Sequence, residues 1–178
     1  ASFVYIVLLV REQIWCWAFG IVGSLLSVYL FFATKLYSEM VLYFFYALMA
    51  VWGWARWRKR EAQQYNPVIV LPLLYHCKAI GWCIAAALGL GTSMLVLTDA
   101  QRPLFDAFTT TFSFFATWLE IAKVLHAWIY WLFLNLASIW LYHDRALDIY
   151  AAQIALYSIM SIWGFVSWRR TYRAQRTA

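Results

Sequence analysis

Residues 128–168 decide the fold, and they read WIYWLFLNLASIWLYHDRALDIYAAQIALYSIMSIWGFVSW. Their first half places Trp128, Trp131 and Asn135 at offsets of three and seven residues, which share one face of an α-helix. In the second half, spacings of four, seven and four put a second stripe on one face, formed by Gln153, Tyr157, Gly164 and Trp168. Both halves are too apolar to be solvent-exposed helices, so we predict two membrane helices.

This stretch has a counterpart earlier in the chain. A shift of 111 residues aligns residues 17–58 with residues 128–169 without a gap. Ten aligned pairs are identical: Trp17 and Trp128, Ser27 and Ser138, Leu30 and Leu141, Leu36 and Leu147, Tyr46 and Tyr157, Met49 and Met160, Trp52 and Trp163, Gly53 and Gly164, Trp57 and Trp168, and Arg58 and Arg169. Such an internal repeat predicts an architecture made from two copies of one unit.

The composition excludes a soluble protein. Of the 178 residues, 65% are hydrophobic, 21% are aromatic and 12% are charged. Soluble domains are about 45–50% apolar and 25% charged. The segments do not alternate polar and apolar residues as barrel strands do. We therefore predict an all-α integral membrane protein with a single transmembrane domain. The net charge of +6 lies in loops and indicates topology, so no nucleic-acid partner is expected.

Hydropathy predicts seven transmembrane helices in a 3+1+3 order. Their expected ranges are 1–10, 14–33, 40–57, 75–97, 104–122, 126–143 and 148–168. The first is shorter than the roughly 20 residues of a span, which favours a truncated helix. We expect four segments: a first repeat (1–58), a linker with one unpaired helix (59–102), a second repeat (103–170) and a basic cytoplasmic tail (171–178). One extra helix restores parallel orientation to two three-helix repeats, as in SWEET-like carriers.

The basic residues predict the orientation. Of the fourteen Lys and Arg residues, three fall on one side of the predicted membrane: Lys35, Arg102 and Arg145. The other eleven fall at the opposite helix ends, together with the C-terminus. Because loops rich in Lys and Arg stay inside, we expect a cytoplasmic C-terminus.

Enzymatic and ion-coupled chemistry find little support in the sequence. No predicted helix carries a charge near its middle, which argues against proton coupling. The segment GLGTS at 89–93 lacks the Lys of a phosphate-binding loop. His76, His126 and His143 are scattered at helix ends, and the three cysteines lack metal-ligand spacing. We expect no catalytic residue, metal or cofactor, and we interpret Glu120 and Lys123 as an interfacial ion pair.

The polar and aromatic stripe is the candidate binding site. Asn135 must be hydrogen-bonded in so apolar a helix, either by a neighbouring helix or by a ligand. Trp128 and Trp131 on the same face favour a ligand, because stacking a ring on an aromatic side chain contributes about 1–3 kcal/mol. Gln153 and Tyr157 would add an amide and a phenol. For any single Trp, core packing or an interfacial belt remains an equal alternative.

At these residues the chain resembles the PnuC family of vitamin transporters, over about residues 3–170. The matching motifs are W-x-x-W-x-x-x-N at Trp128, Trp131 and Asn135 with Tyr142 after it, Y-x6-G-x3-W at Tyr157, Gly164 and Trp168, the Leu36-Tyr37 pair, and W-G-W-x-x-W at Trp52, Gly53, Trp54 and Trp57. The resemblance implies facilitated diffusion of nicotinamide riboside across the bacterial inner membrane. It also implies one site between the two triplets and trapping of the substrate by a separate cytoplasmic kinase.

The same resemblance implies roles for individual residues. Substrate would stack on Trp128 or Trp131 and bond to Asn135, Gln153 and Tyr157, with Trp52 and Trp57 as the far wall. The chain departs from the family pattern at four positions: His126, Ala127, Ala50 and Tyr43, the last where a Gln is usual. We therefore count Tyr43 among the candidate contacts. Alternatives are a carrier for thiamine or riboflavin, a SWEET-like sugar carrier, or a structural subunit, and self-association is also expected.

Overall fold

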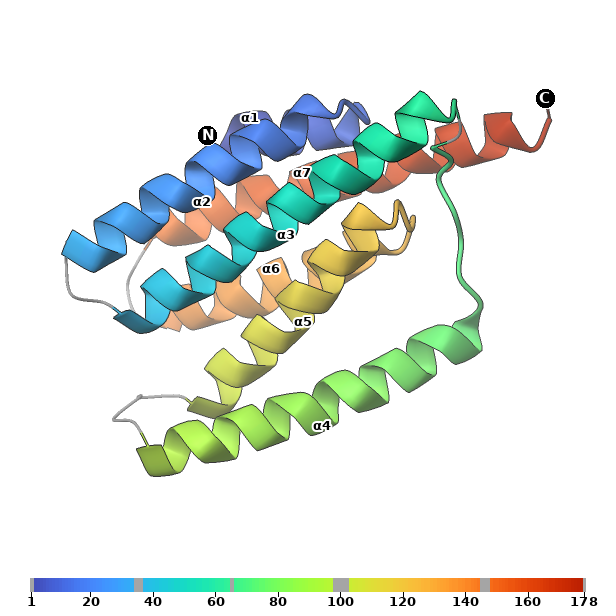
Figure 1. Ribbon diagram of the computed structural model, residues 1–178. Helices are drawn as coiled ribbons and strands as arrows, with labels where there is room; N and C mark the ends of the chain where they lie inside the picture. The colour runs from blue at the N-terminus through green and yellow to red at the C-terminus, as the bar shows by residue number, and fades with distance from the viewer. Residues whose placement is uncertain (1, 34–36, 65, 98–102, 145–147, 178) are drawn as a thin grey trace. The chain divides into compact units, whose positions relative to one another are not determined.

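A computed structural model describes residues 2–33, 37–64, 66–97, 103–144 and 148–177, without the side chains of residues 37–39, 97, 140–144 and 148–153. The described chain is all-α, with one isolated β-bridge between Ile69 and Val124 (Figure 1). Its helices are α1 (Ser2–Val10), α2 (Trp15–Ala33), α3 (Tyr37–Ala62), α4 (Leu73–Leu97), α5 (Pro103–Ile121), α6 (Ala127–Asp144) and α7 (Asp148–Gln175). The predicted all-helical class is confirmed.

Two helices are longer than hydropathy predicts. The span expected at 40–57 belongs to α3, which ends at Ala62, and the one expected at 148–168 belongs to α7, which ends at Gln175. The basic tail predicted at 171–178 is therefore helical through Gln175. Charged residues stop a membrane span without stopping a helix, because Arg, Lys and Glu are good helix formers.

The described helices include two that pass a test of length and hydropathy for crossing a membrane. They cover Trp15–Ala33 and Leu73–Val96. Trp and Tyr lower the hydropathy of the aromatic-rich helices although both residues suit membrane interfaces. This measure alone therefore does not identify all seven expected membrane spans.

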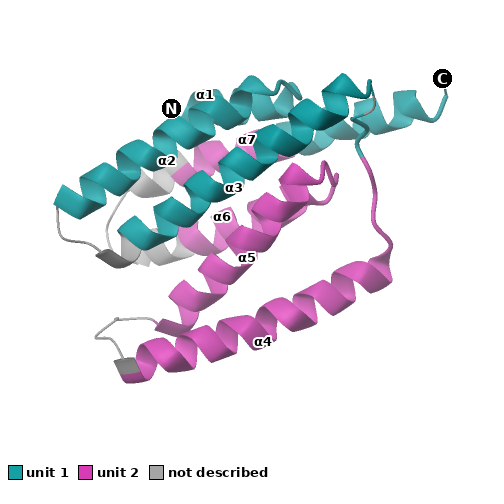
Figure 2. Cartoon of the chain, viewed as in Figure 1, with its two compact units in different colours: residues 1–68, 163–178 teal, residues 69–162 magenta. Residues whose placement is uncertain are grey.

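The chain forms two compact units, coloured in Figure 2. Unit 1 holds residues 1–68 and 163–178, and unit 2 holds residues 69–162. Helix α7 contributes its first half to unit 2 and its second half to unit 1. The proposed division into two repeats and a linker follows the sequence rather than these units, and it stays a prediction.

In unit 1, α2 packs along α3 through a glycine. A Cβ placed on Gly53 would lie 2.6 Å from the Trp17 ring, so only glycine lets the indole lie flat against α3. Trp17 also meets Trp57 edge to face, with ring centroids 5.5 Å apart. Both indoles are fully buried. This contact explains why Trp17, Gly53 and Trp57 are in the repeated motif.

The end of α1 is completed by side chains of α7 in the same unit. The last carbonyl groups of a helix have no partner within the helix. Here Trp168 Nε1 donates to Leu9 O at 3.2 Å, and Ser167 Oγ donates to Val10 O at 3.3 Å. Thr171 Oγ1 adds a 2.7 Å bond to the Glu12 carboxylate in the turn that follows. Trp168 is thus held by backbone in a buried position.

The α1–α2 turn and the α5–α6 turn have the same backbone geometry. Glu12 and Lys123 each adopt a left-handed φ of 58°. In both turns the following amide bonds back five residues, from Gln13 to Leu8 at 2.9 Å and from Val124 to Leu119 at 2.8 Å. This is the Schellman ending of a helix. All three equivalences hold at an offset of 111 residues, so local structure supports the repeat.

In unit 2, α4 packs on α5 and its leading segment is tied to the α5–α6 turn. The amide of Ile69 donates to Lys123 O, and Ile69 O accepts from the amide of Leu125, both at 2.9 Å. Gly91 allows the close approach of α5, since an added Cβ would lie 3.1 Å from the Leu104 Cα. The α5–α6 core is formed by Leu119, Ala122, Val124 and Ala127, and a neighbouring cluster by Cys83, Phe112, Ala116 and Leu134.

Candidate substrate site

The polar face of α6 lies in unit 2 and is partly buried. Trp128 is buried, and Trp131 is half-buried against the cluster that contains Cys83 and Leu134. The indole nitrogen of Trp131 is shielded from solvent and has no hydrogen-bond partner among the described residues. Burying an N–H without an acceptor costs about 1–3 kcal/mol, so the position favours an acceptor supplied by a ligand.

The sequence leaves two partners open for Asn135, a neighbouring helix or a ligand, and the structure is consistent with both. Its Nδ2 donates to Ser161 Oγ on α7 at 3.4 Å, while Ser161 donates to Tyr157 O at 2.9 Å. A helix-to-helix hydrogen bond is therefore present, but it is longer than the usual 2.7–3.2 Å. Within the described part of the chain, the Asn135 carbonyl has no donor. One N–H and the carbonyl oxygen thus remain for a ligand.

Ser161 is a polar neighbour of Asn135 that the sequence analysis missed. It is buried and lies four residues after Tyr157 on the same stripe of α7. Tyr157 itself is half-buried. The i, i+4 spacing could have found Ser161, because that spacing defines the stripe. Gln153 belongs to the backbone of α7, but its side chain lies outside the described residues.

The three candidates on α3 lie in unit 1 in different surroundings. Tyr43 is half-buried and packs on Phe31, with ring centroids 5.3 Å apart. Trp57 is fully buried against Trp17. Trp52 is 42% exposed, and the Arg56 guanidinium lies 5.9 Å from its ring centroid. The structure describes the two units separately, so a contact of these residues with the α6 face stays a prediction.

Comparison with known proteins places this polar and aromatic face in a transporter. The family described as nicotinamide mononucleotide transporter matches residues 1–170. The chain belongs to this family. As a member of the nicotinamide mononucleotide transporter family it is a multi-pass membrane transporter and not an enzyme.

Relatives of this transporter extend over most of its length. The nicotinamide riboside transporters PnuC of Escherichia coli (strain K12) and Shigella flexneri are each 22% identical to it over 191 residues, covering 91% of this chain and 79% of the relative. A crystal structure of the vitamin B3 transporter PnuC superposes with a TM-score of 0.78 at 20% identity, covering 97% of this chain and 79% of the other. The fold is thus the PnuC fold.

A second polar cluster in this transporter joins residues that are far apart in the sequence. His76 Nδ1 lies 3.1 Å from Tyr130 OH, and His76 Nε2 lies 3.1 Å from His126 Nδ1. His76 lies on α4 and Tyr130 on α6, so the network joins these two helices within unit 2. The described residues contain no group of three His, Cys, Asp or Glu that could hold a metal ion.

Proposed function

We propose that this chain carries nicotinamide riboside across the bacterial inner membrane by facilitated diffusion. The observation that carries the proposal is the family match over residues 1–170, with relatives named as nicotinamide riboside transporters. The substrate would stack its cationic pyridinium ring on Trp128 or Trp131, where the indole quadrupole favours a positive ring. Its carboxamide and ribose hydroxyls can form hydrogen bonds with the indole N–H of Trp131 and with the amide of Asn135.

The α6 and α7 face would supply the directional contacts. The buried N–H of Trp131 would donate to a ligand oxygen, and Asn135 would use the carbonyl and the second N–H that Ser161 leaves unused. Tyr157 and Gln153 complete the proposed set on α7. Because the Asn135–Ser161 bond is long, a ligand can replace it at small cost.

Helix α3 would contribute through Tyr43, Trp52 and Trp57. Side chains five residues apart on a helix point about 140° away from each other, so Trp52 and Trp57 cannot both face one ligand. Trp57 lies on the same side of α3 as Tyr43. We therefore favour Tyr43 and Trp57 over Trp52 as the contribution of the first triplet.

Direction of transport and trapping are further parts of the proposal. The distribution of Lys and Arg supports a cytoplasmic C-terminus. Without a nucleotide-binding loop, retention would depend on a separate cytoplasmic kinase that phosphorylates the substrate. Self-association of the carrier is also proposed, and light scattering of the purified protein in detergent would measure it.

Uptake of radiolabelled nicotinamide riboside into proteoliposomes tests the site. Asn135→Ala should lower uptake about five- to 150-fold, because loss of a buried polar contact to a ligand costs about 1–3 kcal/mol. Ser138→Ala is the matched control, because among the described residues the Ser138 hydroxyl donates to Leu134 O in its own helix. Equal uptake by both folded variants would exclude Asn135 from the site. Competition by thiamine, riboflavin or free sugars would reveal the alternative carriers.

A further inference from the structure

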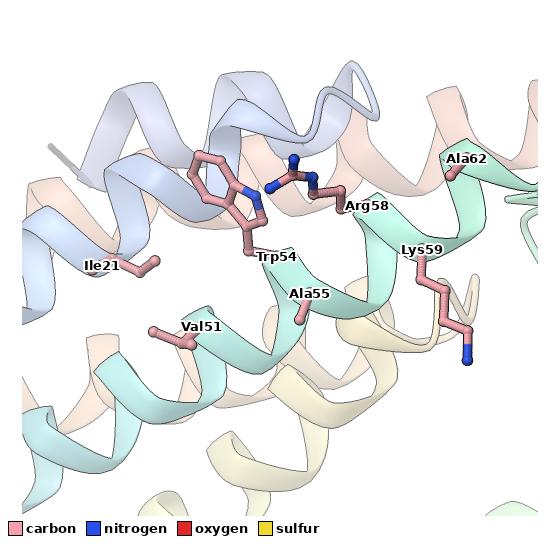
Figure 3. A pocket seen from close by; sticks show the side chains of 7 residues that line it. All are labelled: Ile21, Val51, Trp54, Ala55, Arg58, Lys59 and Ala62. Atoms are coloured by element: carbon pink, nitrogen blue, oxygen red, sulfur yellow. The ribbon is translucent and has the colours of Figure 1, made fainter.

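A groove runs between α2 and α3 in unit 1 (Figure 3). Its volume is about 500 Å³. Its lining residues are Ile21, Val51, Trp54, Ala55, Arg58, Lys59 and Ala62. Most of this lining is aliphatic, and the groove is open along its length. Such a shape suits a flexible hydrocarbon chain better than a compact polar solute.

The groove changes character toward the end of α3. Val51 and Ala55 line the first turns, and Arg58 and Lys59 follow within the next turn. In Figure 3 the two basic side chains project to opposite edges of α3, Arg58 on the side of Trp54. Both are exposed, and neither has an ion-pair or hydrogen-bond partner among the described residues. Two cations thus flank the polar end of an apolar groove.

An aromatic pair indicates where this polar end of the groove lies relative to the membrane surface. Trp15 at the start of α2 meets Trp54 edge to face, with ring centroids 5.6 Å apart, and Trp15 is 60% exposed. Exposed Trp residues at helix ends concentrate where lipid headgroups meet the hydrocarbon. Arg58 and Lys59 lie one turn beyond Trp54, and therefore at the level of lipid phosphates.

We propose that this groove binds an anionic phospholipid. One acyl chain would lie along Ile21, Val51 and Ala55, and the phosphate would bind at the end of the groove that Arg58 and Lys59 line. A net negative headgroup is favoured because basic side chains at the membrane surface attract anionic lipids. The proposal goes beyond vitamin transport and uses only residues that lie outside the candidate substrate site.

Native mass spectrometry of the full chain in detergent tests the proposal. Phosphatidylglycerol should remain bound, and phosphatidylcholine with the same acyl chains should not. The double variant Arg58→Gln with Lys59→Gln should lose about thirtyfold in affinity for phosphatidylglycerol, since each basic side chain near the surface contributes about fivefold. The matched control is Arg169→Gln with Arg170→Gln, which removes the same charge from exposed positions of α7 in the same unit. The control should bind as the unchanged chain does.

A second variant separates the groove from its charges. Ala55 is exposed and lines the groove, so Ala55→Trp should fill it without changing any charge. Loss of phosphatidylglycerol in this variant is expected, with nicotinamide riboside binding unchanged. Equal binding of both lipids, equal weakening by both charge variants, or full binding to Ala55→Trp would each overturn the proposal. Inorganic phosphate alone should not compete. None of these readouts requires transport, so failure of the transport proposal would be seen separately.

Discussion

Glu12 and Lys123, which are 111 residues apart, hold the same left-handed backbone conformation, with φ at 58° in both. Each is the second residue after a helix that ends in a Schellman turn. Their side chains have opposite charge, and the backbone carbonyl groups at the two helix ends have different donors. Trp168 and Ser167 donate to carbonyl groups at the end of α1, and the amide of Ile69 donates to Lys123 O. The repeat is therefore preserved in the backbone while its side-chain contacts have diverged.

The third residue with a left-handed backbone gives the clearest stability test. Gln64, which follows α3, has φ at 54° and an exposed side chain. An L-residue in this region is strained by roughly 1 kcal/mol, and glycine is not. Gln64→Gly should therefore raise the free energy of unfolding by about 0.5–1 kcal/mol, measured by thermal denaturation in detergent. Gln64→Ala keeps the strain and should bring no gain. A gain from alanine equal to that from glycine would refute this explanation.

Two glycines predict opposite responses to alanine. At Gly53 an added Cβ meets the buried Trp17 ring at 2.6 Å, and overpacking of this kind costs about 1–3 kcal/mol. At Gly81 nothing lies within 4 Å, and alanine in a helix interior is favoured by roughly 0.5–1 kcal/mol. Gly53→Ala should lower the melting temperature, and Gly81→Ala should hold or raise it. Equal shifts in both variants would contradict the packing of Trp17.

Substitution of Trp131 should affect substrate binding, and substitution of Trp168 should affect stability. Trp168 is fully buried and its N–H bonds to Leu9 O, so Trp168→Phe should cost about 2–4 kcal/mol through the lost bond and the cavity. The Trp131 N–H has no partner among the described residues, so Trp131→Phe should cost less than about 1 kcal/mol. Trp131→Phe should instead weaken nicotinamide riboside binding five- to tenfold. Unchanged binding would remove the Trp131 N–H from the site.

Helix positions were predictable from the sequence where packing is local. Long apolar runs place α2 and α4 within about two residues of their observed bounds, and the polar turn at residues 11–13 is where it was expected. The ends of α3 and α7 were predicted too early, because a hydropathy limit marks the membrane and not the helix. The bond between Ile69 and the α5–α6 turn was not predictable, since its partners are more than fifty residues apart.

For the candidate site, periodicity found the α6 face but not its neighbours. Trp128, Trp131 and Asn135 follow from helical spacing alone. The Asn135–Ser161 bond and the pairing of His76 with His126 depend on which helices pack together, and hydropathy carries no such information. Spacing was likewise unable to show that Trp57 packs on Trp17.

Isothermal titration of the purified chain in detergent with nicotinamide riboside, thiamine and riboflavin tests most directly which vitamin the chain binds. We expect saturable binding of nicotinamide riboside, no heat from the other two vitamins, and weakened binding in Asn135→Ala with Ser138→Ala unaffected. Binding of thiamine or riboflavin alone would contradict nicotinamide riboside as the substrate, and it would leave the fold and the proposed carrier mechanism unaffected. In that case Tyr43 and His126, where the chain departs from the family pattern, would be the first positions to exchange. Failure to bind any of the three would contradict the transport proposal.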